Sequence, residues 1–377
     1  MSLLPSMAQS TAVSVPAAGA YISAYALGVV FGAPLIAILF ARSPRKALLL
    51  RLLLLFTFGY TISASAWSYE TLLIGRFVAG LPHGAYYGVA SLVAAAMVAE
   101  RRRVQAISYV MIGLAAANVV GVPAATWLGQ ALGWRSAFLA VAGGATVTAL
   151  LLWKLVPSVA PEGEASPLTE LRGLFMPQVW LTLGVASIGF GGMFAVYSYI
   201  TPTLVEVTKL PASMVPLFLA VWGLGMVIGN LAGGWLADRW LVPSIFGTLV
   251  WNMVLLTAFW VAAARPMWAL ANLFLIGVGF ALVPALQARL MRVAGSAQTL
   301  AAALNHSAFN ASNAIGAALG GLAISHGYGW TSTSWVAGGL ALGGLVLMIF
   351  SYRIERSAGS RLCHHATGSS STPAERH

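Results

Sequence analysis

Charged residues and cysteine are both scarce in this chain. Only 8% of its 377 residues are charged, whereas ordinary soluble proteins have roughly 25%. The single cysteine, Cys363, excludes a framework of intrachain disulfides. Hydrophobic residues make up 59% of the chain. They recur in runs of about 20 residues, each long enough to cross a ~30 Å hydrocarbon layer. The composition therefore excludes a soluble globular domain and predicts an all-α polytopic membrane protein.

The predicted membrane spans lack the acidic residues that acid–base catalysis or metal binding would require. No Asp or Glu lies inside a predicted membrane span, and no group of His, Cys and carboxylate residues has the spacing of metal ligands. The glycine-rich run at 223–229 resembles a dinucleotide-binding loop only loosely, because it lies inside an apolar run rather than after a strand. The sequence predicts neither an enzyme nor a bound cofactor or metal.

The positive charges are present but unevenly placed. Of the 20 Lys and Arg residues, 16 fall in alternate connections between the apolar runs, at 42–51, 101–103, 154–172, 239, 289–292 and 353–376. This asymmetry follows the positive-inside rule, so these connections are predicted to face the cytoplasm of a multi-pass protein of the inner (plasma) membrane. A nucleic-acid partner is excluded, because no basic face with interleaved aromatic residues exists outside these loops.

Two similar apolar stretches reveal an internal repeat. Both carry glycines at four-residue spacing, which let another helix approach closely in lipid. At an offset of 197 residues, Leu27 matches Leu224 and Arg42 matches Arg239. The glycines of the two stretches are Gly28, Gly32, Gly225, Gly229 and Gly233. A repeat of this length predicts two similar halves, as in one class of secondary transporter.

The apolar runs predict eleven spans, at 18–40, 47–66, 71–98, 104–128, 136–156, 179–202, 213–237, 243–263, 267–286, 300–325 and 332–352. They form an N-terminal bundle (1–156) and a C-terminal bundle (179–352). A Pro-rich cytoplasmic linker (157–178) joins them, and a disordered tail (353–377) follows. At the repeat offset Pro5 falls on Pro202, which closes a long span. The counterpart of that span would begin before Met1, so five plus six helices are predicted where six plus six are expected.

The third span carries a polar stripe. Arg76, His83 and Tyr87 share one helix face, with Gly80 and Gly84 beside them. An intramembrane arginine costs roughly 2.5–3.5 kcal/mol to insert and therefore suggests function, although it could also anchor the outer end of the helix. His83 could carry a proton near neutral pH, or it could be a neutral histidine hydrogen-bonded between helices.

Further polar groups lie in other spans. His306, Asn310 and Asn313 share a face, and Asn118 echoes Asn313 between the halves. These side chains are either hydrogen-bonding contacts between helices or a binding site at the interface of the halves. Phe194 and Tyr197 belong to an aromatic stripe that suits core packing or an apolar wall for an amphiphilic solute.

The loop after each glycine-rich span resembles a motif of the major facilitator superfamily. The family motif is G-x-x-x-D-R-x-G-R-[KR], in which the acid and bases belong to a gating charge network. The second copy keeps its first part, ending in Asp238 and Arg239. The first copy has Ala37 and Ala41 where glycine and aspartate would stand, and it keeps the latter part as Arg42, Arg45 and Lys46.

Other segments resemble the twelve-spanner drug/proton antiporter group, in particular the arabinose-efflux-permease-like branch, so that the resemblance covers about residues 3–352. Arg76 through Gly80 is similar to an arginine motif linked to proton transfer. Gly113 and the run from Gly121 to Pro123 resemble a glycine–proline antiporter motif of close helix packing. Members of this branch usually carry an acid in the first helix, a plausible partner of Arg76.

The resemblance implies a major-facilitator fold that alternates access to a site between two bundles. The expected function is proton-coupled efflux of a small neutral or amphiphilic solute, such as a drug or a sugar. Arg76 and His83 would serve proton coupling, and the proton gradient would supply the energy without a cofactor. The expected partners are the solute and the lipid bilayer, with the chain as a monomer. The alternatives are a sugar or nucleoside uptake permease, and a truncated, non-transporting remnant or membrane sensor.

Overall fold

The computed structural model describes residues 3–13, 18, 20–157 and 171–368, which are almost entirely helical and contain no β-strand. The short helix α1 (Leu4–Ser10) comes first. The long helices of the N-terminal bundle are α3 (Ala20–Leu39), α4 (Arg45–Ser65), α5 (Tyr69–Ala96), α6 (Arg103–Ala116), α7 (Val122–Leu132) and α8 (Trp134–Leu155). The π-helical segment η2 (Ala117–Gly121) joins α6 to α7, so that together they make one span.

The C-terminal bundle begins with a broken span and ends with a long helix. Its helices are α10 (Pro177–Gly184), α11 (Gly191–Ser198), α12 (Ile200–Pro202), α13 (Val215–Ala262), α14 (Pro266–Val278), α15 (Leu282–Val293), α16 (Gln298–Ala323) and α17 (Ser332–Gly368). Non-helical backbone angles at Trp240 divide α13 into two spans. The eleven predicted spans therefore each coincide with a helix, a half of α13, or a series of two or three successive helices.

Local sequence signals explain several helix ends. At the start of α5, the Ser68 Oγ accepts the Thr71 N–H at 3.2 Å, and the Thr71 Oγ1 accepts the Ser68 N–H at 3.0 Å. This capping box satisfies backbone donors that have no partner within the helix. Pro266 occupies the first turn of α14, where its missing N–H costs nothing. Between α7 and α8, Gly133 has φ +86°, a value that glycine adopts readily, and the chain reverses there.

The internal repeat is visible in the packing of the two halves. A Cβ on Gly28 would overlap the carbonyl oxygen of Phe77, so α3 and α5 touch through their backbones. At the same offset of 197 residues, a Cβ on Gly225 would overlap the carbonyl oxygen of Phe274, between α13 and α14. Other glycines predicted at helix contacts are packed in the same way. A Cβ would overlap backbone atoms of Leu81 at Gly32, of Tyr25 at Gly80, of Val278 at Gly229 and of Ala281 at Gly233.

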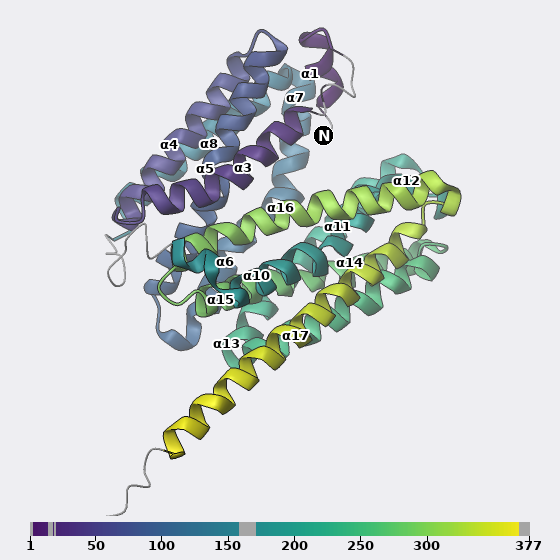
Figure 1. Cartoon of the computed structure of the whole chain (residues 1–377). Helices are drawn as coiled ribbons and strands as arrows, with labels where there is room; N and C mark the ends of the chain where they lie inside the picture. Colours follow the sequence, from purple (N-terminus) through teal and green to yellow (C-terminus); the bar gives the residue numbers. More distant parts are fainter. Residues whose placement is uncertain (1–2, 14–17, 19, 158–170, 369–377) are drawn as a thin grey trace, which may run out of the picture.

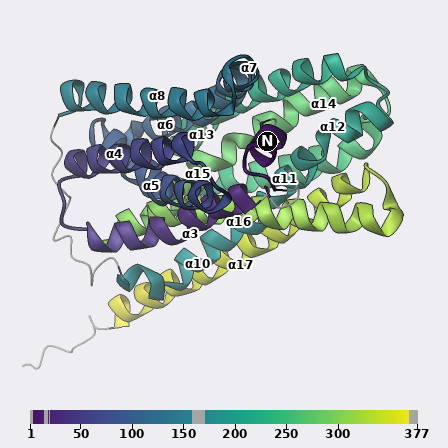
Figure 2. The same cartoon turned by 90° about the horizontal axis from the view of Figure 1, so that it is seen from above.

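The bundles meet at the end that carries the basic loops. Figure 1 shows them converging where α4 begins and diverging toward α1 and α12. Seen from above, the long helices run side by side, with α8 and α17 at opposite margins (Figure 2). Along α16 the inner half is buried, including Leu300 and Ala303, whereas Asn313 and Leu322 farther out are exposed. With the basic loops in the cytoplasm, this is an outward-facing arrangement.

Eight helices of the described residues are long and apolar enough to span a membrane by length and composition. The long helices α5 and α16 are not among these eight. Both carry the polar residues that the sequence singles out, which lower their hydropathy. They also pack against each other between the bundles, so the two helices that carry the predicted polar stripes share one interface.

The C-terminal end of the second bundle differs from the sequence-based boundary. Helix α17 continues through residues 353–368, where a disordered tail is predicted; no proline interrupts the stretch before Pro373, which lies outside the described residues. Most of the predicted linker (158–170) and residues 369–377 also lie outside the described residues.

Candidate functional site between the two bundles

Arg76 is held in a box of aromatic rings. Its Cζ lies 4.4 Å from the ring centre of Tyr25, 5.5 Å from that of Phe138 and 5.7 Å from that of Tyr60. Its Nε donates to the carbonyl oxygen of Tyr21 at 3.4 Å. These partners come from α3, α4 and α8, so Arg76 ties three helices to α5. Ring faces attract a guanidinium electrostatically, and this attraction strengthens where water is excluded.

Tyr25 connects Arg76 to the next member of the predicted stripe. While its ring lies under the Arg76 guanidinium, its hydroxyl forms a 2.7 Å hydrogen bond with Nδ1 of His83. The ring of His83 is in turn 5.2 Å from that of Tyr87. Arg76, His83 and Tyr87 therefore form one chain of contacts. Tyr25, which the sequence analysis did not single out, links Arg76 to His83. Tyr25 lies three residues before Gly28, on the face that packs against Gly80, so the glycine pattern could have identified it.

This chain of contacts crosses from one bundle to the other at His306. Tyr87 stacks on His306 with ring centres 4.7 Å apart, and the rings of His83 and His306 are 6.1 Å apart. His306 is only 4% exposed, and its Nε2 has no hydrogen-bond partner among the described residues. Two histidines, one from each bundle, therefore face each other across the bundle interface.

The other predicted solute-binding residues lie farther out. Asn313 is exposed, whereas Asn310 donates its amide to the His306 carbonyl oxygen of its own helix at 2.8 Å. Tyr197 is 40% exposed and packs edge-on against Trp222 at 5.3 Å. Phe194 joins an aromatic core with Phe190, Phe280 and Phe309. The side chain of Asn118, in η2, is outside the described set, as is that of Pro123.

Gly113 and Gly121 differ from the expected glycine contacts. A Cβ on Gly113 would meet nothing within 4 Å, and one on Gly121 would meet only Ala117 of the same segment at 3.7 Å. Gly84, in contrast, lies at the bundle interface, where a Cβ would be 2.9 Å from that of Ala33 and 3.4 Å from that of His306. Gly113 and Gly121 are exposed in this outward-facing arrangement, so the expected close packing at these two glycines is not seen.

The cytoplasmic closure is formed by the second copy of the loop motif. The Asp238 carboxylate accepts the backbone N–H groups of Val104 at 2.8 Å and Gln105 at 2.9 Å, at the N-terminus of α6. An acid from the C-terminal bundle thus caps a helix of the N-terminal bundle, where the helix dipole favours negative charge. Arg239 does not join this contact, because it stacks on Trp235 at 3.9 Å.

The first copy of the loop motif is organised differently. Ala41, at the position of the family aspartate, is buried, and Arg42 is exposed. Lys46 donates to the carbonyl oxygen of Trp153 at 2.8 Å, within its own bundle. On this side α3 and α16 pack through apolar contacts, which involve Ala33, Ala37, Leu300 and Ala303. The cytoplasmic side is therefore closed by two different contacts. Asp238 of the second copy caps α6, whereas α3, which precedes the first copy, packs against α16 through an apolar seam of Ala33, Ala37, Leu300 and Ala303.

Two glycines make this closure tight. A Cβ on Gly88 of α5 would lie 2.7 Å from the backbone nitrogen of Ala303 and 2.9 Å from the backbone carbon of Ala302. A Cβ on Gly234 of α13 would lie 2.5 Å from the Ser108 Oγ and 3.1 Å from the Gln105 Cα. Each glycine of one bundle therefore lies against a helix of the other.

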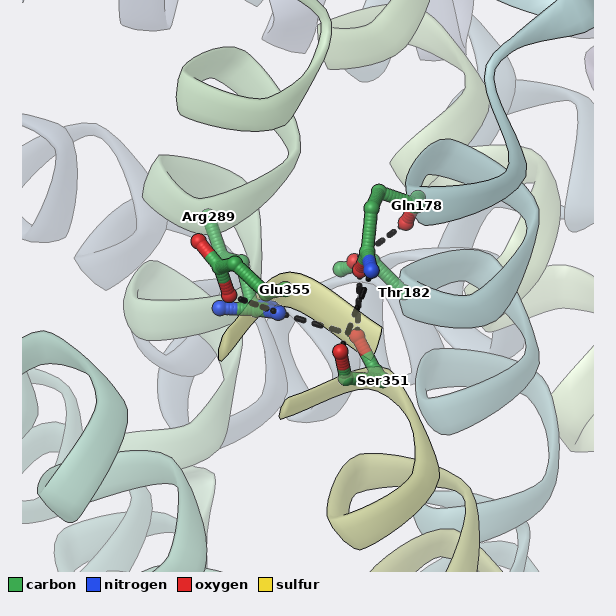
Figure 3. Close-up of polar contacts among 5 residues, drawn as sticks. All are labelled: Gln178, Thr182, Arg289, Ser351 and Glu355. Atoms are coloured by element: carbon green, nitrogen blue, oxygen red, sulfur yellow. Dashed lines mark hydrogen bonds and ion pairs between the residues drawn. The ribbon is translucent and has the colours of Figure 1, made fainter. Parts of the chain in front are cut away.

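A buried arginine that the sequence placed in a loop supports the cytoplasmic end of the C-terminal bundle (Figure 3). Arg289 of α15 is 1% exposed, and its guanidinium donates to the Ser351 Oγ at 2.9 Å and the Glu355 Oε2 at 3.2 Å, both on α17. Gln178 of α10 bonds the Ser351 carbonyl oxygen at 3.0 Å. This network explains why α17 continues helical past residue 353, because Glu355 has a partner there.

The Arg289–Glu355 pair predicts unequal mutational costs. Glu355→Gln leaves a buried guanidinium without its counter-charge and should cost about 1–3 kcal/mol of unfolding free energy, a figure reduced because the carboxylate side is partly hydrated. Arg289→Met leaves a carboxylate that is 46% exposed, and should cost less than about 1 kcal/mol. Thermal unfolding of the purified variants in detergent measures both. An equal loss, or a larger one for Arg289→Met, would contradict this assignment.

The arrangement of two repeated bundles is that of a known family. A model of the Major Facilitator Superfamily matches residues 1–301. The chain belongs to the Major Facilitator Superfamily. It is 40% identical over 351 residues to the inner membrane transport protein YdhP of Escherichia coli (strain K12), covering 93% of this chain and 90% of that one.

Two further relatives and a solved structure agree with this membership. The AraJ protein of Escherichia coli (strain K12) is 31% identical over 360 residues, covering 94% of this chain and 91% of AraJ. A chloramphenicol resistance protein of Streptomyces lividans is 30% identical over 358 residues, covering 93% and 91%. The crystal structure of the major facilitator transporter FucP in the outward conformation superposes with a TM-score of 0.69 at 17% identity, covering 93% of each chain. The major-facilitator fold predicted from the sequence is confirmed, and the chain is a multi-pass inner membrane transporter rather than an enzyme.

Proposed function

We propose that this chain exports a small neutral or amphiphilic solute in exchange for protons, by alternating access of the site between its bundles. The observation that carries the proposal is the pair of facing histidines, with rings 6.1 Å apart across the bundle interface. Histidine is the side chain whose charge changes most readily near neutral pH. A chloramphenicol resistance protein among the relatives supports an amphiphilic solute.

In this proposal protonation separates the bundles. A proton that enters from the open outer side converts His83 to an imidazolium, close to the Arg76 guanidinium and facing His306. Both ring nitrogens of His83 then donate, so the Tyr25 hydroxyl must become an acceptor. A charge confined between the bundles disfavours their contact, because an imidazolium in a water-poor interface has lost its hydration and regains it when the interface opens. The cytoplasmic side opens, the proton leaves, and a solute can bind.

The solute would contact the more exposed groups of the interface. Tyr87 and Tyr197 offer ring faces with a hydroxyl, and Phe194 adds an apolar wall, a combination that suits an amphiphilic molecule. Asn310 and Asn313 would provide hydrogen bonds, with Asn118 as a further predicted contact. We assign His306 to proton coupling together with His83, because its stacking on Tyr87 leaves it buried.

Solute-dependent proton movement tests this function. Proteoliposomes that contain a pH-sensitive dye and carry an imposed pH gradient would be exposed to chloramphenicol and to a panel of sugars. We expect proton flux that requires a solute and is lost in both His83→Phe and His306→Phe. His326→Gln is the matched control, since His326 lies exposed in the π-helical segment Ile324–Tyr328 that follows α16. Flux that is independent of solute, or unchanged in both phenylalanine variants, would overturn the proposal, and proton and solute moving in the same direction would favour uptake.

A further inference from the structure

A cavity of about 750 Å³ lies at the cytoplasmic end, between the two bundles. The N-terminal bundle contributes Arg45, Arg101 and Arg103 to its lining, and the C-terminal bundle contributes Arg292. The cavity is separate from the histidine site, which lies deeper in the interface. Its four guanidinium-bearing side chains therefore converge on one space from two bodies that move relative to each other in alternating access.

The charge of this cavity is not balanced by its acids. Glu100 and Asp238 are the two carboxylates in its lining. Both oxygens of Asp238 are already used, because they accept the N–H groups of Val104 and Gln105. Among the residues that the structure describes, the one ion pair within 4 Å joins Arg289 to Glu355, so Arg101, Arg103 and Arg292 pair with no carboxylate. The cavity thus has an excess of positive charge.

The positive-inside rule explains why arginines lie on this face, but not why these ones gather in a cavity. Other basic residues of the same face have their charged groups engaged elsewhere. Arg51 bonds the Ser43 Oγ at 3.3 Å, and Arg239 stacks on Trp235 at 3.9 Å. Arg45 is only 8% exposed and forms part of the cavity wall. By position and by contacts, Arg101, Arg103 and Arg292 therefore differ from Arg51 and Arg239.

The rest of the lining defines the kind of ligand. Between the arginines the wall is apolar, with Leu92 and Ile107 on one side and Leu241 and Met291 on the other. Arginine binds phosphate oxygens with strong, charge-assisted hydrogen bonds. Basic pockets between helices on the cytoplasmic side can hold lipid headgroups in this way.

We infer that this cavity binds a phosphate group carried by an amphiphile, with an anionic phospholipid of the cytoplasmic leaflet as the source that the apolar wall favours. A bound phosphate would contact Arg103 of one bundle and Arg292 of the other. It would therefore hold the cytoplasmic side closed and favour the outward-facing state. A soluble phosphate ester is the other source of the same chemistry.

Lipid retention by the purified full chain tests this site. Native mass spectrometry would compare retention of phosphatidylglycerol and phosphatidylcholine by the wild type, by Arg103→Gln, by Arg292→Gln and by the double variant. Each basic side chain near a lipid phosphate contributes about fivefold in affinity, so the double variant should lose roughly 25-fold for phosphatidylglycerol. Phosphatidylcholine should bind weakly to all. The control Arg51→Gln, which changes a charge on the same face outside the cavity, should lose less than about twofold.

A second arm separates the two sources of phosphate. Thermal unfolding in neutral detergent would be followed with inorganic phosphate in place of lipid. Stabilisation by inorganic phosphate that disappears in the double variant assigns the cavity to a soluble phosphate and supports the shared chemistry. An equal loss of phosphatidylglycerol in Arg51→Gln, or no loss of either ligand in the double variant while it remains folded, would overturn the site. Neither result depends on solute transport, so the export proposal and this one can fail separately.

Discussion

Replacing Gly88 by valine is expected to reduce transport roughly 5- to 150-fold while leaving the protein inserted and folded. In the cytoplasm-closed state the new Cβ would lie 2.7 Å from the backbone nitrogen of Ala303 and 2.9 Å from the backbone carbon of Ala302. Backbone atoms of a helix cannot move aside singly, so the clash is relieved only when α5 and α16 separate. Overpacking of this kind costs about 1–3 kcal/mol, a shift of roughly 5- to 150-fold in the equilibrium between the two states.

The variant should therefore populate the inward-facing state. In a Cys363→Ser background, a cysteine introduced at Gln105 lies in the closed interface beside Gly234. A membrane-impermeant maleimide, added to the cytoplasmic face of everted vesicles, should label this cysteine faster when Gly88→Val is also present. The matched control is Gly143→Val on α8, because a Cβ there would meet nothing within 4 Å. Unchanged labelling in the Gly88 variant, or an equal loss of transport in the control, would contradict a gating role.

Arg76→Ala is expected to abolish export, by roughly 100-fold or more, if proton transfer at His83 depends on this charge. The substitution removes the cation that Tyr25, Tyr60 and Phe138 surround, and with it the positive field next to the Tyr25–His83 hydrogen bond. Arg76→Lys should keep an intermediate activity, because an ammonium retains the charge but not the planar stacking. Solute-dependent proton flux in proteoliposomes measures all three proteins.

A second stacked arginine provides the control for Arg76. Arg135 lies 4.4 Å from the ring centre of Trp134 and donates to the Ala66 carbonyl oxygen at 2.7 Å, at the outer end of the same bundle. Arg135→Ala removes a comparable cation–π contact away from the histidines, so proton coupling should persist in the folded variant. Export that survives Arg76→Ala, or that is lost equally in Arg135→Ala, would assign Arg76 to anchoring the helix rather than to coupling.

The cytoplasmic closure shows how the two halves have diverged while keeping one framework. Asp238 caps α6 in the second half, whereas the matching position in the first half is the buried Ala41. A charged cap is directional, since it needs the first N–H groups of a helix. An apolar seam is not directional and depends on close packing. Opening of the cytoplasmic side must therefore break hydrogen bonds along α6 and expose apolar surface along α16.

Much of the architecture follows from the sequence alone. The 197-residue offset predicted two like halves, and Gly28 and Gly225 do make the same contact in each. By the positive-inside rule, the uneven arginines predict which end of the helices faces the cytoplasm. The spacing of Arg76, His83 and Tyr87 predicted a shared face, because the helical period of 3.6 residues is a local property of one chain segment. Composition and residue spacing determine properties of a single helix, and charge asymmetry determines how a helix lies relative to the membrane. Neither depends on which helices pack together, so these features can be predicted from the sequence.

The contacts that define the candidate site were decided by tertiary structure. Periodicity states which residues share a face, but not which neighbouring helix meets that face or at what depth. The placement of Tyr25 between Arg76 and His83, and of His306 opposite His83, depends on how α3 and α16 are rotated and shifted against α5. The same holds for the cap that Asp238 makes on α6 and for the burial of Arg289 against Glu355. These are long-range contacts, whose partners are selected by the packing of whole helices.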